Sequence, residues 1–162
     1  MGGVNEICSD KTGTFTKNVM TVTHIFIEEA VFDTISESIA NESSLKFFCL
    51  SICNNTDANP NIAFKGNDII NEQIGNKTDC ALLEMSFKMG HNYKKIRNKN
   101  QQLKVFPFNS EKKKMTTIYE GDKGIKYLFI KGAPDFLLPH CTKYINKNGS
   151  VSAISVTFKN SL

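Results

Sequence analysis

The 162-residue sequence lacks any apolar run long enough to cross a membrane, and it does not open with a signal peptide. A membrane-spanning helix needs roughly 18 consecutive apolar residues, so we do not expect these residues to enter a bilayer themselves. Internal repeats and low-complexity tracts are lacking too. With 40% apolar and 22% charged residues, the composition is that of an ordinary globular chain. The length suits one domain, or one domain and a piece of another.

The sequence also lacks a strong charge of either sign. Its 20 basic and 16 acidic residues leave a net charge of +4, and lysines concentrate in residues 93–104 and 111–115. A basic nucleic-acid-binding domain is one interpretation of these lysines. A polyanionic small molecule such as a nucleotide needs no more positive charge than this, so we do not expect a nucleic-acid partner.

The five cysteines form an odd number and lack the regular spacing of a disulfide framework. Disulfides persist mainly in oxidising compartments, so we expect reduced thiols in a cytosolic environment. Cys49 and Cys53 lie four residues apart on an expected helix, but no second pair accompanies them to complete a metal site.

The pattern of apolar residues and turn formers predicts an α+β fold with a largely antiparallel β-sheet flanked by helices. Apolar residues recur at near-helical spacing over 34–55, interrupted or capped around 41–44, and a second amphipathic helix is expected from an N-cap at Thr78 to Gly90. In the first half of the chain we also expect a short buried strand ending near residue 8, one or two strands within 19–31 and a loop over 56–68. A basic linker should then precede three strands at 102–108, 114–120 and 125–131, the last two joined by a hairpin turn at 121–124. The remaining expectations are a short helix starting at Pro134 and a strand and turn over 143–154.

Residues 7–16 read "ICSDKTGTFT", an order of small and charged residues that a Ser/Thr-rich surface turn does not explain. The segment "DKTGTFT" resembles the phosphorylation motif DKTGTLT of the P-type ATPases, the ion and lipid pumps that form an aspartyl-phosphate during transport. The resemblance implies that Asp10 attacks the γ-phosphate of ATP as nucleophile. It also implies that Lys11 offsets charge on the transferring phosphoryl group, and that Asp10 and Thr12 help to hold Mg²⁺. Phe15 replaces the family's usual Leu, so we expect only a packing change there.

The segment "GNKTDCALLE" (75–84) resembles the TGExTExALL-type stretch of the family's nucleotide-binding domain. Thr78 and Asp79 match the Thr-Glu pair whose acid accepts a hydrogen bond from the adenine amino group, and Asp is one methylene shorter than Glu. Without the resemblance, a plain helix N-cap with an acid in its first turn would explain both residues.

The segment "VFPFNSEKKKM" (105–115) resembles the family's FxFxSxxKxM stretch. The resemblance implies that Phe108 stacks on adenine and that Lys113 lies near the phosphates or the ribose. The alternative from the residues alone is a core phenylalanine on a strand, followed by a solvated run of lysines.

The segment "FIKGAPDFLL" (129–138) is similar to the family's KGAPE stretch. Lys131 would then reach the nucleotide, and Gly132 would permit its close approach. Each of these short motifs is weak alone, but four of them occur in the family's order over about 130 residues. Together they support the resemblance.

Among the P-type ATPases, these segments look closest to the calmodulin-regulated, plasma-membrane type of Ca²⁺ pump. The resemblance implies ATP as substrate, Mg²⁺ as cofactor, and a position on the cytosolic face of a membrane. The expected partners are the actuator, the rest of the phosphorylation domain and the transmembrane helices of the parent pump, with calmodulin as its regulator.

The family's TGD loop and GDGxND motif, which complete the phosphorylation domain, are missing from the sequence. We therefore expect residues 1–22 to be a segment of the α/β, HAD-like phosphorylation domain. Residues 23–162 would be a nucleotide-binding domain truncated at its C-terminal end, which binds ATP without turnover. The alternatives are another cation pump for Na⁺, K⁺ or H⁺, and a non-catalytic nucleotide-binding module.

Overall fold

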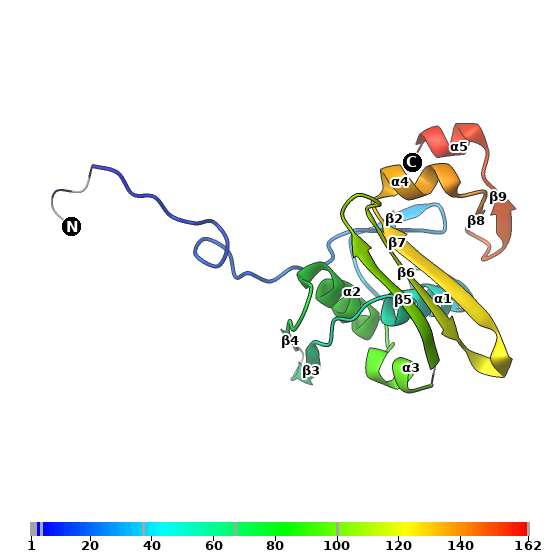
Figure 1. The fold of residues 1–162 in the computed structure, drawn as a ribbon, viewed down its shortest axis with the longest axis horizontal. Helices are drawn as coiled ribbons and strands as arrows, with labels where there is room; N and C mark the ends of the chain where they lie inside the picture. The colour runs from blue at the N-terminus through cyan, green and yellow to red at the C-terminus, as the bar shows by residue number, and fades with distance from the viewer. Residues whose placement is uncertain (1–2, 4, 37, 67, 100, 162) are drawn as a thin grey trace.

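The computed structural model describes residues 3, 5–36, 38–66, 68–99 and 101–161. Figure 1 shows two unlike parts, an extended N-terminal segment and a folded body that begins near the first strand. Over these described residues, the body combines five α-helices with small antiparallel sheets of two or three strands. This architecture confirms the predicted α+β class.

The first hairpin of the body pairs β1 (Ile25–Ile27) with β2 (Ala30–Phe32). Its two turn residues, Glu28 and Glu29, both have positive φ, at 51° and 65°, as a two-residue hairpin turn of type I′ requires. The prediction of one or two strands within 19–31 is therefore confirmed, although the strands begin only at Ile25.

Three helices form one side of the body: α1 (Glu42–Asn54), α2 (Lys77–Lys88) and α3 (Tyr93–Lys99). The helix predicted over 34–55 is confirmed from residue 42, and Asn41 is its N-cap, within the predicted interruption or cap around 41–44. The predicted basic linker is wrong over α3. Tyr93 is buried in the body, and such a buried side gives a short, lysine-rich segment a reason to be helical.

The segment expected to be a loop over 56–68 contains part of a hairpin of β3 (Asn61–Lys65) and β4 (Asp68–Glu72). That prediction is wrong because contacts with α2 support these short strands. The Asn71 side chain on β4 donates a 2.8 Å hydrogen bond to Glu84. The Phe64 ring lies 5.0 Å from the Phe87 ring.

The largest sheet contains β5 (Gln101–Asn109), β6 (Lys114–Glu120) and β7 (Lys126–Gly132), in that order and antiparallel. It confirms all three predicted strands and the turn at 121–124, which forms the short 3₁₀ helix η1 (Asp122–Gly124). One face of the sheet packs on α1, where the Phe47 ring lies 5.5 Å from that of Phe129. Alternate residues of β6, which are Met115, Thr117 and Tyr119, are buried on this face.

The C-terminal part of the body covers one end of the sheet (Figure 1). It contains α4 (Pro134–Leu137), the 3₁₀ helix η2 (Leu138–His140), the hairpin of β8 (Lys143–Ile145) and β9 (Val151–Ala153), and α5 (Val156–Ser161). Pro134 occupies the first turn of α4 as predicted. The Asn41 side chain donates to the backbone carbonyl of Lys147, which joins this part to the start of α1.

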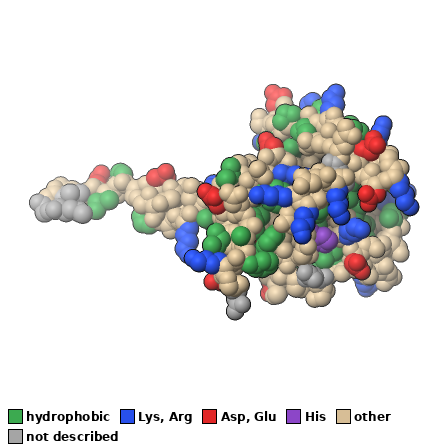
Figure 2. All heavy atoms as spheres, turned by 90° about the horizontal axis from the view of Figure 1, so that it is seen from below, with side chains coloured by type: hydrophobic (Ala, Val, Ile, Leu, Met, Phe, Trp, Pro, Cys, Tyr) green, Lys and Arg blue, Asp and Glu red, His purple; other side chains and the backbone are tan. Residues whose placement is uncertain are grey.

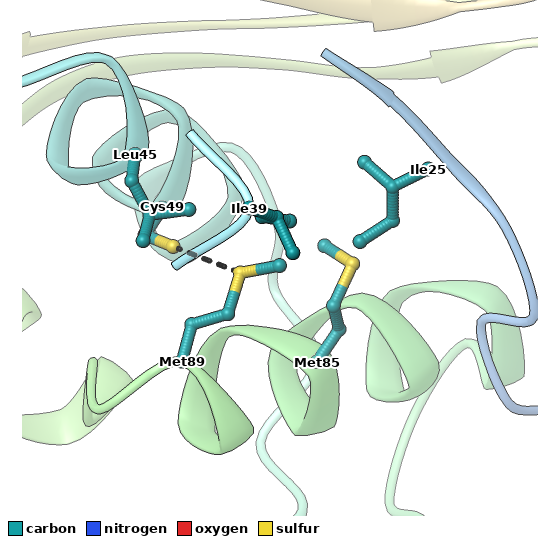
Figure 3. Close-up of a cluster of buried hydrophobic side chains, with 6 residues drawn as sticks. All are labelled: Ile25, Ile39, Leu45, Cys49, Met85 and Met89. Carbon is teal, nitrogen blue, oxygen red and sulfur yellow. Dashed lines mark hydrogen bonds between the residues drawn. The ribbon is translucent and has the colours of Figure 1, made fainter. Parts of the chain in front are cut away.

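The core lies between α1 and α2 (Figure 3). Met89, which caps the end of α2, points toward Cys49 of α1, and the Cys49 thiol lies 3.8 Å from its sulfur. Met85 of α2 points toward Ile25 and Ile39. Burial raises the pKa of the Cys49 thiol to about 11. This thiol is therefore neutral at physiological pH, as expected for a packing residue rather than a reactive one.

A second cluster of buried side chains includes Cys53, Cys80 and Leu83. Burial raises the pKa of the Cys53 thiol to about 12. All five cysteines of the chain are free thiols, as the sequence predicts.

The N-terminal segment does not contain the short buried strand predicted to end near residue 8. Residues 5–10 have no regular structure, and Ile7 is 79% exposed. Figure 1 shows this segment extending away from the body, so the strand has no neighbour with which to pair. Among the described residues, no helix has the length and apolarity needed to cross a bilayer.

Candidate functional site

An open cavity of about 690 Å³ lies between the start of α2 and one end of the three-stranded sheet. Volumes of roughly 300–1,000 Å³ are typical of sites for small molecules. The cavity is lined by residues from four separate parts of the chain: Asp57, Gly75, Asn76, Thr78, Asp79, Leu82, Val105, Pro107, Phe108, Lys113, Met115, Lys131, Gly132 and Ala133. All six residues that the sequence assigns to nucleotide binding are among them.

Asp79 and Lys131 form an ion pair at the cavity wall. In the register of the sheet Lys131 lies opposite Met115, so its side chain shares the helix-facing side with that buried residue. Asp79 lies in the first turn of α2 and is only 7% exposed. Burial of a carboxylate costs free energy unless the group is paired and hydrogen-bonded. The helix dipole, whose positive end lies at the first turn of α2, also stabilises the negative charge of Asp79.

The N-cap of α2 is Asn76 rather than the predicted Thr78. The Asn76 side chain accepts hydrogen bonds from the backbone N–H groups of Thr78 and Asp79, at 3.0 and 3.2 Å. Asn is among the best N-cap residues, and its position two residues earlier places Thr78 inside the helix. The Thr78 hydroxyl instead contacts the sulfur of Met20 at 3.7 Å.

Phe108 is 61% exposed, which excludes the alternative that it is a core residue. Strict alternation along β5 would place it on the same side as Phe106, away from Val105 and Pro107. The register of β5 against β6 shifts between Phe106 and Asn109. Such an irregularity re-aims a side chain, and Phe108 lines the cavity together with Val105 and Pro107.

Lys113 lies in the turn between β5 and β6, with a positive φ of 49°. Its backbone carbonyl accepts a 3.0 Å hydrogen bond from the N–H of Ala133. Gly132 fits closely beneath this turn, because a Cβ atom at that position would lie 2.2 Å from the Lys113 carbonyl oxygen. Gly132 is therefore required for the close approach of β7 to the turn that contains Lys113. This requirement is separate from the predicted approach of a nucleotide to Gly132.

The loop after α1 supplies a residue that no sequence motif indicates. The Thr56 hydroxyl donates a 2.6 Å hydrogen bond to the second carboxylate oxygen of Asp79. Asn55, beside it, accepts a 2.9 Å hydrogen bond from the Thr117 hydroxyl on β6. The loop therefore joins α2 to the sheet behind the cavity.

Asp10, Lys11 and Thr12 lie apart from this cavity, in the extended segment (Figure 1). All three residues are exposed. A turn begins at Lys11, whose carbonyl accepts a 3.1 Å hydrogen bond from the N–H of Phe15. Phe15 is 76% exposed. The structure therefore does not bring the predicted phosphorylation residues together with the predicted nucleotide-binding residues.

The chemistry of Asp10 and Thr12 fits Mg²⁺, because this ion prefers carboxylate and other oxygen ligands. Two such residues supply only part of an octahedral set. Within the part of the chain that the structure describes, no group of three or more His, Cys, Asp or Glu side chains could hold a metal.

On the face seen in Figure 2, several basic side chains lie across the middle of the folded body, and acidic side chains lie around them, so the face carries charge of both signs. A broad positive surface would be the electrostatic footprint of a nucleic-acid-binding protein. The arrangement on this face does not favour that alternative.

Comparison with known proteins gives a family and a set of relatives. Residues 45–162 match the family model described as "P-type ATPase, cytoplasmic domain N". The chain is 37% identical over 157 residues to "Putative calcium-transporting ATPase 7, plasma membrane-type" of Arabidopsis thaliana, which covers 93% of this chain and 15% of that protein. It is 33% identical over 159 residues to "Plasma membrane calcium-transporting ATPase 1" of Homo sapiens, covering 92% and 13%.

A third relative, "Calcium-transporting ATPase PAT1" of Dictyostelium discoideum, is 34% identical over 161 residues, which cover 96% of this chain and 14% of that protein. The chain therefore spans about one seventh of the length of the curated relatives it matches.

Proposed function

The chain belongs to the P-type ATPases, whose cytoplasmic domain N it matches, and from this premise we propose that residues 23–162 bind ATP in the cavity beside α2. The main support for this proposal is that all six predicted nucleotide-binding residues line one cavity: Thr78, Asp79, Phe108, Lys113, Lys131 and Gly132. These residues come from three separate segments, so their convergence does not follow from sequence proximity. The cavity also has the mixed character of a nucleotide site, with one exposed aromatic ring and two lysines.

The arrangement of the lining residues supports one orientation of the nucleotide. Phe108 presents an exposed ring on which adenine stacks. Asp79 accepts a hydrogen bond from the adenine amino group, since an ionised carboxylate is an acceptor only. Lys113, in the turn between β5 and β6, supplies positive charge for the phosphates or the ribose. Lys131 reaches the nucleotide beside Asp79, with which it is paired.

We further propose that residues 1–22 belong to the phosphorylation domain of the parent pump and that Asp10 accepts the γ-phosphoryl group. A carboxylate oxygen of Asp10 forms a bond to the γ-phosphorus, the bond to the bridging oxygen breaks, and ADP leaves with that oxygen. Lys11 offsets negative charge on the transferring group. The exposure of residues 10–16 supports this role, because the nucleophile has to meet a phosphate held by another part of the pump.

Asp10 and Thr12 would hold Mg²⁺ through oxygen atoms, and the ion would neutralise charge on the phosphate oxygens. Since the relatives are named as calcium-transporting ATPases, we propose that the parent pump transports Ca²⁺ and that this chain lies on the cytosolic face of its membrane. The rest of the pump supplies the remaining catalytic groups. Calmodulin as regulator of the parent stays a prediction.

Replacement of the aromatic ring tests ATP binding by this chain. Phe108→Ala should weaken the binding of a fluorescent ATP analogue by roughly tenfold or more, because stacking is worth about 1–3 kcal/mol. Phe106→Ala is the matched control. It removes the same ring from the same strand, but Phe106 lies beside Lys104 and does not line the cavity.

Affinity should therefore fall in Phe108→Ala and stay unchanged in Phe106→Ala, with the circular dichroism of both proteins intact. Equal affinities in the two variants would remove Phe108 from the site. Absence of ATP binding by the unaltered chain would remove the proposed function.

A further inference from the structure

Thr56 holds its hydroxyl in a single orientation. The residue is 5% exposed and lies in the loop that follows α1. Its oxygen accepts a 3.1 Å hydrogen bond from the backbone N–H of Ala58, and it donates a 2.6 Å hydrogen bond to Asp79. A hydroxyl has one proton to donate. Since the Ala58 group is itself a donor, that proton goes to Asp79.

The backbone of this loop is fixed by Arg97 of α3. Its guanidinium donates hydrogen bonds to the carbonyls of Cys53 at 2.7 Å, Ala58 at 2.9 Å and Thr56 at 3.2 Å. The Tyr93 ring lies 4.7 Å below the guanidinium carbon. A planar guanidinium with several donors is pre-organised for such a set of carbonyls, so the Thr56 hydroxyl has a rigid support.

The carboxylate of Asp79 is consequently held on both sides, with one oxygen paired to Lys131 and the other to Thr56. A second, smaller cavity of about 50 Å³ adjoins the same three residues. Asp79 thus borders two cavities, and the contacts with Thr56 and Lys131 hold its carboxylate in one orientation.

We propose that Thr56 is a positioning residue that makes the nucleotide site select adenine over guanine, by preventing the Asp79 carboxylate from turning. This inference rests on the proposed binding of ATP in the cavity.

The selectivity follows from the edges that the two bases present. Adenine carries an amino donor at its 6-position, whereas guanine carries a carbonyl acceptor there. Guanine also has neighbouring N–H and NH₂ donors, and a carboxylate that can rotate accepts both at once with its two oxygens. A carboxylate whose oxygens are held by Thr56 and Lys131 keeps its remaining lone pairs in fixed directions, and it cannot turn both oxygens toward the two guanine donors. It serves the adenine amine and repels the guanine carbonyl.

The test compares the affinities of three variants of this chain for fluorescent analogues of ATP and GTP. Thr56→Val keeps the shape of the side chain but removes the hydroxyl, and Thr56→Ser keeps the hydroxyl. Thr117→Val is the matched control, because it removes another buried threonine hydroxyl, which bonds to Asn55 and not to Asp79. Any general loss of stability should therefore affect both valine variants.

We expect the preference for ATP over GTP to fall about tenfold in Thr56→Val, the size of one hydrogen bond to a charged group. Thr56→Ser and Thr117→Val should keep the preference of the unaltered chain. If Thr56→Val does not fold, Thr56→Ala supplies a second protein without the hydroxyl, with the same expectation.

An unchanged preference in the folded variant without the hydroxyl would overturn the role of Thr56, and so would loss of the preference in Thr117→Val. Binding of ATP and GTP with equal affinity by the unaltered chain would also overturn it, while leaving ATP binding intact. Absence of binding of either nucleotide would overturn the proposed function, and this inference with it.

Discussion

Residues 10–16 carry the most recognisable motif of the chain, and the structure positions them least. All seven are exposed, and their hydrogen bonds run within residues 9–18. The cavity of the body shows the opposite relation. Its lining residues come from segments that are unremarkable one by one, yet one of them, Asp79, is buried and is joined to Thr56 and Lys131, which lie far from it along the chain.

This difference is the one expected if the two regions have the two functions that we propose for them. A phosphorylated aspartate needs its own neighbours in sequence, since they shape the turn around it, and such a contiguous motif is visible without a structure. The residues that line a binding cavity, in contrast, come from distant segments that packing brings together. The two regions can therefore be separated experimentally.

The largest expected effect follows from replacing the nucleophile in the parent pump that we propose. Asp10→Asn keeps the size of the side chain but cannot form the acyl phosphate, so phosphoenzyme should fall to background. ATP binding should survive, because the cavity lies in the body. Acid-quenched labelling with γ-labelled ATP, run beside a nucleotide-binding assay, measures both.

Asp68→Asn is a suitable control, since Asp68 is exposed on β4 and remote from the motif; its phosphoenzyme should equal that of the unaltered pump. Hydroxylamine-sensitive label retained by the Asp10→Asn protein would assign the nucleophile to another residue. Loss of ATP binding in the same protein would show that ATP binding by the body depends on the N-terminal segment.

The sheet and α2 could be predicted because their signals are local. Alternation of apolar residues and the turn at 121–124 define β6 and β7, and the apolar spacing after residue 77 defines α2. The hairpin of β3 and β4 could not be predicted in this way. Pro60 and Gly66 favour a loop when the sequence is considered alone, whereas contacts with distant side chains of α2 and α3 support the strands, among them the 2.6 Å hydrogen bond from the Tyr93 hydroxyl to the Pro60 carbonyl.

The candidate site was predictable only where a family motif covers it. Thr56 and Arg97 lie outside the motifs, and their roles arise from contacts across 23 to 44 residues of sequence. One signal could have indicated Arg97: it is the single arginine among the 20 basic residues of the chain. A position that needs a planar group with several donors cannot be filled by lysine.

The second largest effect should come from the support beneath the cavity. Arg97→Ala leaves three buried carbonyl groups without their donor, so we expect a loss of about 2–4 kcal/mol in the free energy of unfolding. Urea unfolding followed by circular dichroism measures it. Lys95→Ala on the exposed side of α3 should change stability by less than about 0.5 kcal/mol. Equal stabilities of the two variants would show that the loop after α1 does not depend on Arg97.

The smallest expected effect concerns the boundary between the two regions. Deletion of residues 1–18 removes the whole motif but no side chain that packs in the core, so the free energy of unfolding should change by less than about 0.5 kcal/mol. Deletion of residues 1–24 is the contrasting case. It removes Val22, which packs against the core, and Met20, whose backbone exchanges two hydrogen bonds with the Gln73 side chain. This longer deletion should cost on the order of 1 kcal/mol or more. A large loss from the shorter deletion would mean that the motif contributes to the fold, and the contrast between segment and body would fail.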